Sequence, residues 1–222
     1  MAIENRKIEH EHIIICEGRD EQNFLLSFLK SSEMQRKDQR LGENVGVLNF
    51  GGNDELPIFL KNIRNTPGYN KVKTILIMRD AETSVTQAID QIGSALERSG
   101  FALPERTGYW SDAKEVKVAF LLFPDLNDNP TEGTLEDLCL RLLKEEYQPE
   151  IVIDKISDIM SCLKNKGVRY FKHDFKTRLH SFFSLTDGFV GSKVGEAARY
   201  GAFNWESIEL EYLYKMIIEA FG

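Results

Sequence analysis

The sequence predicts an α/β fold: a parallel sheet of about four strands flanked by helices, followed by a C-terminal helical appendage. Two patterns lead to this prediction. In the first half of the chain, short apolar runs alternate with segments of helical periodicity. In the second half, helical periodicity continues but no further strand can be recognised. Strands that are apolar on both faces and separated by helices are typical of a parallel sheet covered on both sides.

The strands are expected at residues 12–17, 45–50, 74–78 and 117–123, each an apolar run of four to seven residues. A helix should begin at about Asp20, because apolar residues recur from there at helical spacing. A second helix should follow Gly51-Gly52, with Asn53 or Asp54 as its cap. A third should follow Ser84, which forms a capping-box pattern with Gln87.

After the loop at residues 124–130, the pattern predicts helices at about 134–147, 149–165, 171–185 and 206–221. We therefore expect residues 1–130 to form the α/β core and residues 131–222 the helical appendage. No repeat, low-complexity tract or Gly/Ser linker separates the two parts. The appendage should consequently pack on the core within the same domain.

The composition excludes several classes of protein. With 222 residues, 42% of them hydrophobic and 10% aromatic, the chain can build a substantial core, which argues against disorder. A net charge of −7 argues against a general polyanion binder. The apolar runs are too short for a membrane helix, and the N-terminus shows no signal peptide. Because Cys16, Cys139 and Cys162 are odd in number and widely spaced, we expect reduced, buried cysteines in a cytoplasmic protein.

Acidic side chains follow two of the expected strands. Glu17 ends the first strand, and Asp80 and Glu82 follow the third. Ligands of open parallel sheets bind at the carboxyl ends of the strands, and a spacing of two puts Asp80 and Glu82 on one side if the backbone stays extended. Three converging carboxylates repel one another unless a cation joins them, and Mg²⁺ or Mn²⁺ prefers such oxygen ligands. Alternatively, each carboxylate caps the following helix or is solvated.

These residues also carry a resemblance to a known family. The segments Ile-Ile-Cys-Glu17-Gly18-Arg-Asp-Glu and Ile-Met-Arg-Asp80-Ala81-Glu82 resemble the Toprim domain of topoisomerases, primases, recombination mediators and OLD-family nucleases. The family pattern is a strand-terminal Glu-Gly followed by Asp-x-Asp, so Glu82 departs from it by one methylene. The resemblance covers roughly residues 10–125 and implies that Asp80 and Glu82 bind Mg²⁺ or Mn²⁺. It gives Glu17 the role of a metal ligand or a general acid/base.

The helical remainder is similar to small Toprim-like proteins related to the OLD nucleases, partly through Gly133-Thr134-Leu135-Glu136-Asp137-Leu138. An acidic element after the core helps such nucleases to hold a second metal, which implies that role for Glu136 and Asp137. The alternative is structural. Thr134 with Asp137 is a variant of the capping box, and acids in a first helical turn complement the helix dipole. Both roles can coexist.

A basic segment interrupts the acidic chain. Six basic residues and one acid lie between residues 164 and 178, interleaved with three aromatic residues. Such a stripe can pair with phosphates while an aromatic ring stacks on a base, and we take Lys172, Lys176 and Arg178 as its nucleic-acid contacts. The OLD resemblance implies a lysine near the metals. Of Lys172 and Lys176, which lie one helical turn apart, Lys176 is the better candidate for this role. One alternative is a solvated helix face whose aromatic residues Phe171, Phe175 and Phe182 point into the core, and another is an intramolecular match of the stripe to the acidic segment 125–150.

These observations lead to the expectation of a Mg²⁺-dependent phosphoryl-transfer protein that acts on nucleic acid, foremost a Toprim/OLD-type nuclease. Two alternatives stay open. The first is an effector module that binds a metal or nucleotide without turnover, and the second is a nucleotide phosphohydrolase. The choice between DNA and RNA, and between a monomer, a homo-oligomer and a complex with a protein partner, is also open.

Overall fold

A computed structural model describes residues 7–52, 55–167 and 173–221, and it confirms the expected α/β fold. Four parallel strands form one sheet in the order β2-β1-β3-β4. They are β1 (His12–Cys16), β2 (Val45–Asn49), β3 (Thr74–Asp80) and β4 (Lys117–Phe123). In register, Ile13 pairs with Gly46 of β2 and with Ile75 of β3. Strands β1 and β3 are buried along their whole length, as expected for strands covered on both faces.

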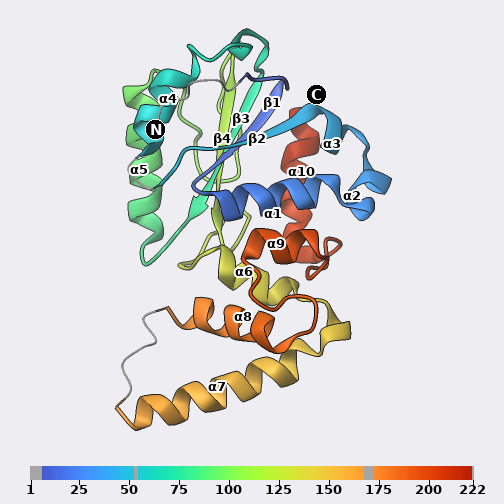
Figure 1. Cartoon of the computed structure of the whole chain (residues 1–222). Coiled ribbons are helices and arrows are strands. Elements are labelled where there is room, and N and C mark those ends of the chain that lie inside the picture. Colours follow the sequence, from blue (N-terminus) through green and yellow to red (C-terminus); the bar gives the residue numbers. More distant parts are fainter. Residues whose placement is uncertain (1–6, 53–54, 168–172, 222) are drawn as a thin grey trace.

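Helices cover both faces of the sheet (Figure 1). One face carries α4 (Leu56–Ile63) and α5 (Val85–Arg98), which pack on a buried cluster that contains Ile13, Ile75 and Ile77. The other face carries α1 (Arg19–Lys30) and the C-terminal helices, which pack on a cluster containing Ile14 and Met78. The alternation of strand side chains therefore supplies two separate apolar layers.

The C-terminal half is helical, as expected. It contains α6 (Leu135–Leu142), α7 (Pro149–Asn165), α8 (Asp174–Leu185), α9 (Val194–Arg199) and α10 (Glu211–Ala220). Leu138 of α6, Phe182 of α8 and Leu213 of α10 belong to the same buried cluster as Ile14 of β1. Figure 1 shows α7 and α8 at the end of the molecule farthest from α4. The division near residue 130 stays a prediction, but this helical half and the sheet share one core.

The structure corrects several boundaries. The helix expected at 134–147 ends at Leu142, and the one expected at 206–221 consists of a short turn, η4 (Ile208–Leu210), followed by α10. Three short helices were not expected: α2 (Ser32–Lys37), α3 (Arg40–Asn44) and α9. They are too short for apolar periodicity to stand out. The cap expected at Asn53 or Asp54 lies outside the described residues.

The cap expected for α5 is present. The Ser84 hydroxyl accepts a hydrogen bond from the Gln87 backbone N–H at 3.3 Å, which caps α5.

Of the cysteines, Cys16 and Cys139 are buried as expected, whereas Cys162 is exposed on α7, so the prediction for that residue is wrong. Its neighbours in sequence are apolar, but α7 buries only Ile156 and Met160, because one side of this helix faces solvent.

Candidate functional site

The strand order places one crevice at the centre of the sheet. The chain leaves β1 toward β2 on one side, whereas β3 lies on the other side, so the connections diverge between β1 and β3. Ligands of open α/β sheets bind at such a switch point, outside the carboxyl ends of the strands. Glu17 follows the last residue of β1, and Asp80 is the last residue of β3. The topology therefore brings these two acids to the same edge.

Asp80 is a buried carboxylate, with 8% of its surface exposed. Its Oδ1 accepts a hydrogen bond of 2.8 Å from the backbone N–H of Leu135, the first residue of α6. Burial raises the pKa of Asp80 well above its usual range, and the nearby carboxylates Glu21, Glu136 and Glu17 raise it further. The ionised form of Asp80 is therefore electrostatically unfavourable in the folded protein, although one of its oxygens accepts a hydrogen bond.

Glu17 is half-buried and carries an orphan oxygen. Its Oε2 is buried without a hydrogen-bond partner among the described residues. Burial raises the pKa of Glu17; the positive charge of Arg79 opposes this, while Glu21 and Glu82 reinforce it. Because buried carboxylate oxygens are normally satisfied, this oxygen marks a position where a ligand or cation would find an acceptor.

Glu21 belongs to the same cluster and was missed from the sequence. It is the third residue of α1, and its Oε2 accepts a hydrogen bond of 3.0 Å from the backbone N–H of Gly18. Burial raises the pKa of Glu21, as do the neighbouring carboxylates Asp20 and Glu136. Its position in the sequence could have indicated this role, because the side chain of the third residue of a helix often reaches back to the residues that precede the helix, here the end of β1.

The backbone at Glu82 is not extended, so the prediction that the strand spacing persists to this residue is wrong. Strand β3 ends at Asp80, and Glu82 adopts a left-handed backbone with φ of +54°, so the extended spacing does not persist. The cause is a backbone bridge, in which Glu82 and Gly133 exchange two hydrogen bonds of 2.8 Å. The exposed Glu82 side chain acts on the pKa values of Glu17 and Lys176, and it is not among the main causes that raise the pKa of Asp80.

The two acids at the start of α6 have separate roles. The Glu136 side chain is 12% exposed, and its Oε1 lies 3.2 Å from Nζ of Lys176. Asp137 instead caps α6, because its Oδ2 accepts hydrogen bonds from the backbone N–H of Thr134 at 2.8 Å and from the Thr134 hydroxyl at 3.1 Å. Glu136 therefore joins the acidic cluster, and the described contacts of Asp137 are those of the structural alternative.

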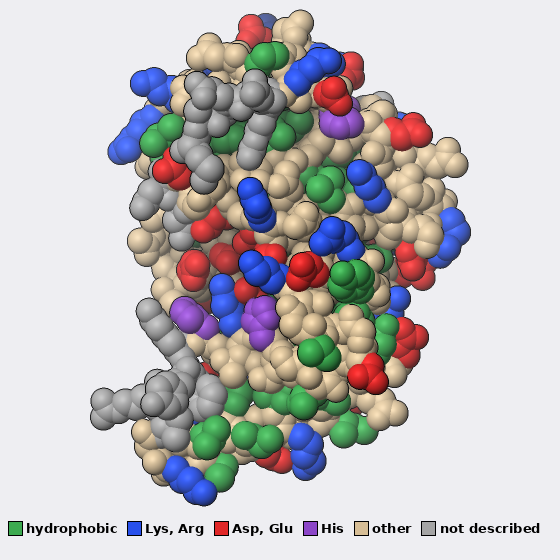
Figure 2. Space-filling model, viewed as in Figure 1, with side chains coloured by type: hydrophobic (Ala, Val, Ile, Leu, Met, Phe, Trp, Pro, Cys, Tyr) green, Lys and Arg blue, Asp and Glu red, His purple; other side chains and the backbone are tan. Residues whose placement is uncertain are grey.

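Lys176 on α8 brings positive charge to this cluster. Burial lowers its pKa, but the stronger combined effect of Glu136, Asp80 and Glu82 raises it, so Lys176 stays protonated. Lys176 on α8 therefore lies in the field of carboxylates from the end of β3, from the turn that follows it and from α6. We name the carboxylates Glu17, Glu21, Asp80, Glu82 and Glu136 the acidic edge, with Lys176 as its cation. Figure 2 shows acidic side chains gathered in the middle of one face, with Lys or Arg and His side chains beside them.

The other basic residues of the expected stripe differ in whether the structure describes them and in the contacts they make. Lys172 lies outside the described residues, as do Arg169, Tyr170 and Phe171. Lys164 forms an ion pair with Asp174 at 2.6 Å, so part of the stripe is compensated within the protein. Arg178 is half-buried, and its Nε has no hydrogen-bond partner among the described residues. Of the aromatic residues expected to face inward, Phe182 is buried and Phe175 is 46% exposed.

A comparison with family models identifies the relatives of this chain. The model described as "Protein of unknown function (DUF3226)" matches residues 11–221. The chain belongs to this family. The match includes the whole sheet, the acidic edge and all of the C-terminal helices. No curated protein and no solved structure matches the chain. Among the described helices of this DUF3226 member, none is long and apolar enough to cross a membrane.

The chemistry of the acidic edge fits a divalent cation, although its side chains are not drawn together. Within residues 7–52, 55–167 and 173–221, no three Asp, Glu, His or Cys side chains are grouped closely enough to hold a metal ion. The donors are nevertheless all carboxylate oxygens, which Mg²⁺ and Mn²⁺ prefer. The orphan oxygen of Glu17 and the mutual repulsion around Asp80 are both relieved by a cation. Binding one requires these side chains to move closer together.

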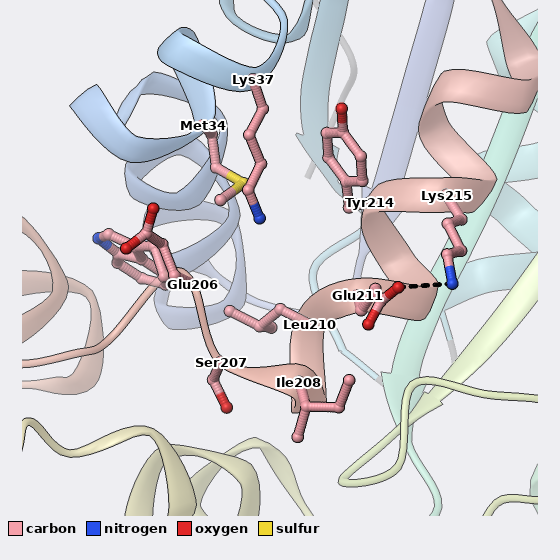
Figure 3. A pocket seen from close by; sticks show the side chains of 10 residues that line it. Met34, Lys37, Glu206, Ser207, Ile208, Leu210, Glu211, Tyr214 and Lys215 are labelled. Carbon is pink, nitrogen blue, oxygen red and sulfur yellow. Dashed lines mark ion pairs between the residues drawn. The ribbon is translucent and has the colours of Figure 1, made fainter.

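A different cavity lies between α2 and α10, away from the acidic edge (Figure 3). It has a volume of about 250 Å³ and an apolar floor that includes Met34 and Leu210. The ion pair between Glu211 and Lys215, at 2.6 Å, lies on its rim. None of the carboxylates of the acidic edge lines this cavity. It is therefore a separate feature, and we assign it no role in the chemistry at the strand ends.

Proposed function

We propose that this protein is a Mg²⁺-dependent nuclease that hydrolyses phosphodiester bonds at the acidic edge. The observation that supports this most is the buried Asp80, whose pKa is raised by its burial and by the charges of Glu21, Glu136 and Glu17, together with the Lys176 cation 3.2 Å from Glu136. The motifs around Glu17 and Asp80 also resemble those of the Toprim domain, in which carboxylates at these strand ends serve phosphoryl transfer.

Each residue has a distinct part in this proposal. Asp80, Glu21 and Glu136 would hold the cation, and Glu82 would support it from the exposed side. Bound Mg²⁺ would supply Lewis-acid polarisation of the phosphate and of a water molecule. Glu17 would accept or donate the proton, because its Oε2 is an acceptor without a partner in the described structure. Lys176 would stabilise the negative charge that develops on the phosphate oxygens.

The experiment compares metal-dependent cleavage by the parent protein and by Glu17→Gln, which keeps the size of the side chain and removes its charge. The substrates are supercoiled plasmid, single-stranded DNA and RNA, with Mg²⁺, Mn²⁺ or EDTA. An identically purified Glu206→Gln protein is the matched control, because Glu206 is exposed and lies outside the acidic edge. We expect cleavage by the parent and by the control, and none by Glu17→Gln. Equal cleavage by all three proteins contradicts the proposal.

One observation favours a second function. In the described structure, Lys176 is already paired with Glu136, and no three donors converge. Such a site fits an effector module that binds a metal or a nucleotide without turning it over. Under that function, Mn²⁺ raises the melting temperature of the parent but no substrate is cleaved. Release of phosphate from nucleotides without strand cleavage would instead indicate a nucleotide phosphohydrolase.

A further inference from the structure

A groove lies on the other side of β3 from Asp80. It has a volume of about 580 Å³ and is bounded by the first turn of α4 and by one side of α5. These two helices cover the same face of the sheet (Figure 1). Its lining includes Arg79 of β3, next in sequence to Asp80. Because adjacent residues of a strand point to opposite faces, Arg79 faces this groove while Asp80 faces α6.

Arg79 connects the groove with the acidic edge. Only 3% of its surface is exposed, so little more than the edge of this residue borders the groove. Its positive charge acts on Glu17, whose pKa it lowers. Cys16 pairs with Met78 in register, and Glu17 and Arg79 are the residues that follow this pair, so the groove ends beside the carboxylate to which we assign the proton transfer. This adjacency distinguishes the groove from the cavity between α2 and α10.

The side chains along α5 suit a chain of phosphates. Ser84, Gln87, Gln91 and Ser94 follow one another at helical spacing, and Arg98 ends the row. Asp90 is the single carboxylate of the described lining. Arginine, serine and glutamine are among the side chains that contact phosphate oxygens in nucleic-acid complexes. Helix α5 has 14 residues and is therefore about 20 Å long, so the row can follow several consecutive phosphates of one strand.

We propose that this groove binds a single strand of nucleic acid through its phosphates and leads it past Arg79 to the acidic edge. A single strand is favoured over a duplex because the polar lining follows one side of a single helix, α5, and can track one phosphate backbone. Among the described residues, no aromatic side chain that could stack on a base lines the groove. Contacts to phosphates would therefore dominate, and sequence preference would be weak. The delivery of a strand to the acidic edge rests on the proposed nuclease function, whereas binding in the groove does not.

The test measures binding without cleavage. A fluorescein-labelled thymidine oligonucleotide of about ten residues, a length typical of single-strand sites, is titrated in EDTA, and its fluorescence polarisation is followed over a range of salt concentrations. Arg98→Gln removes one phosphate contact, and Ser94→Glu places a negative charge on an exposed position of the groove. Lys61→Gln is the matched control, because Lys61 is exposed on α4 but does not line the groove. Circular dichroism checks that each variant is folded.

We expect Arg98→Gln to weaken binding by about tenfold and to flatten the dependence of log K on log salt by about 0.7. Ser94→Glu should weaken binding as well, and Lys61→Gln should leave affinity and salt slope unchanged. Unchanged affinity in both groove variants overturns the proposal. So does equally tight binding of thymidine monophosphate, which indicates a nucleotide pocket, or tighter binding of a duplex of the same length.

The same assay separates this proposal from the proposed nuclease function. Glu17→Gln should bind the oligonucleotide at least as tightly as the parent does in EDTA, because Glu17 does not line the groove and the substitution removes a negative charge near the strand. Binding that depends on Arg98, together with no cleavage by the parent under any metal condition, refutes the nuclease and supports the groove. Cleavage that depends on Glu17, together with binding that ignores Arg98 and Ser94, supports the nuclease and refutes the groove.

Discussion

Replacing Asp80 by asparagine should not destabilise the metal-free protein at pH 7, although Asp80 is buried at the centre of the fold. Asparagine keeps a carbonyl oxygen that can accept the 2.8 Å hydrogen bond from the Leu135 backbone N–H. It removes a charge that burial and the neighbouring Glu21 and Glu136 oppose. The free energy of unfolding of Asp80→Asn should therefore equal or exceed that of the parent.

The alanine variant supplies the magnitude. Asp80→Ala leaves the Leu135 N–H without its acceptor, and an unsatisfied buried donor costs about 1–3 kcal/mol. For a protein of this size, each kcal/mol corresponds to about 2–4 °C in the melting temperature. Thermal unfolding should therefore rank Asp80→Asn at or above the parent and Asp80→Ala below Asp80→Asn. In urea, the same order should appear in the transition midpoints.

The pH dependence has a definite sign. Because the pKa of Asp80 is raised in the folded state, the folded protein binds more protons than the unfolded chain above an unfolded pKa of about 3.9. The contribution of Asp80 to the free energy of unfolding therefore falls as the pH rises. The advantage of Asp80→Asn over the parent should shrink as the pH is lowered from 7 toward about 4.

Added metal completes the test. A cation present at about a hundred times its dissociation constant stabilises the parent by about 2.7 kcal/mol, and Asp80→Asn should lose most of this gain. Differential scanning fluorimetry with and without MgCl₂ measures both effects. A marked loss of stability in metal-free Asp80→Asn would refute the reasoning, because it would show that the charge of Asp80 holds the fold together.

Three further predictions concern residues around the acidic edge and the sheet. Asp137→Ala should lose the cap of α6 and about 0.5–2 kcal/mol in urea unfolding, yet keep the metal-induced rise in melting temperature; loss of that rise would make Asp137 a ligand. Lys176→Gln leaves the largely buried Glu136 carboxylate without its cation, so it should lower the stability of the metal-free protein by about 1–3 kcal/mol and slow cleavage; unchanged stability with normal cleavage would contradict this. Gly195→Ala places a Cβ 2.5 Å from that of Asn23 and should cost about 1–3 kcal/mol, whereas Gly93→Ala meets no atom within 4 Å and should gain about 0.5–1 kcal/mol. Equal unfolding midpoints for the two glycine variants would refute this packing account.

The sheet could be predicted from the sequence because each buried strand is a continuous apolar run bounded by turn residues. The segment that ends at Cys16 and the segment 117–123 show this pattern directly. The short helix α9 could not be predicted in this way. It packs against α1 where Gly195 approaches Asn23, and its six residues depend on that long-range contact rather than on a local pattern.

The candidate site was predicted in part. The positions of Glu17 and Asp80 follow from strand ends in a parallel sheet, and these positions are visible in the sequence. The conformation of Glu82 is not visible there, because it depends on a backbone bridge to Gly133, some fifty residues later. The cap formed by Asp137 was one of the two alternatives that the sequence offered, whereas the contact of Glu136 with Lys176 depends on how α8 packs and is not visible there.

The most direct measurement of the central claim is a crystal structure of the protein soaked in MnCl₂, with anomalous scattering collected to locate manganese. The account predicts a manganese ion coordinated by Asp80 and at least one of Glu21, Glu136 and Glu17, with Lys176 displaced from its contact with Glu136. Carboxylates that keep their metal-free positions, or manganese bound only at other surface acids, would contradict it.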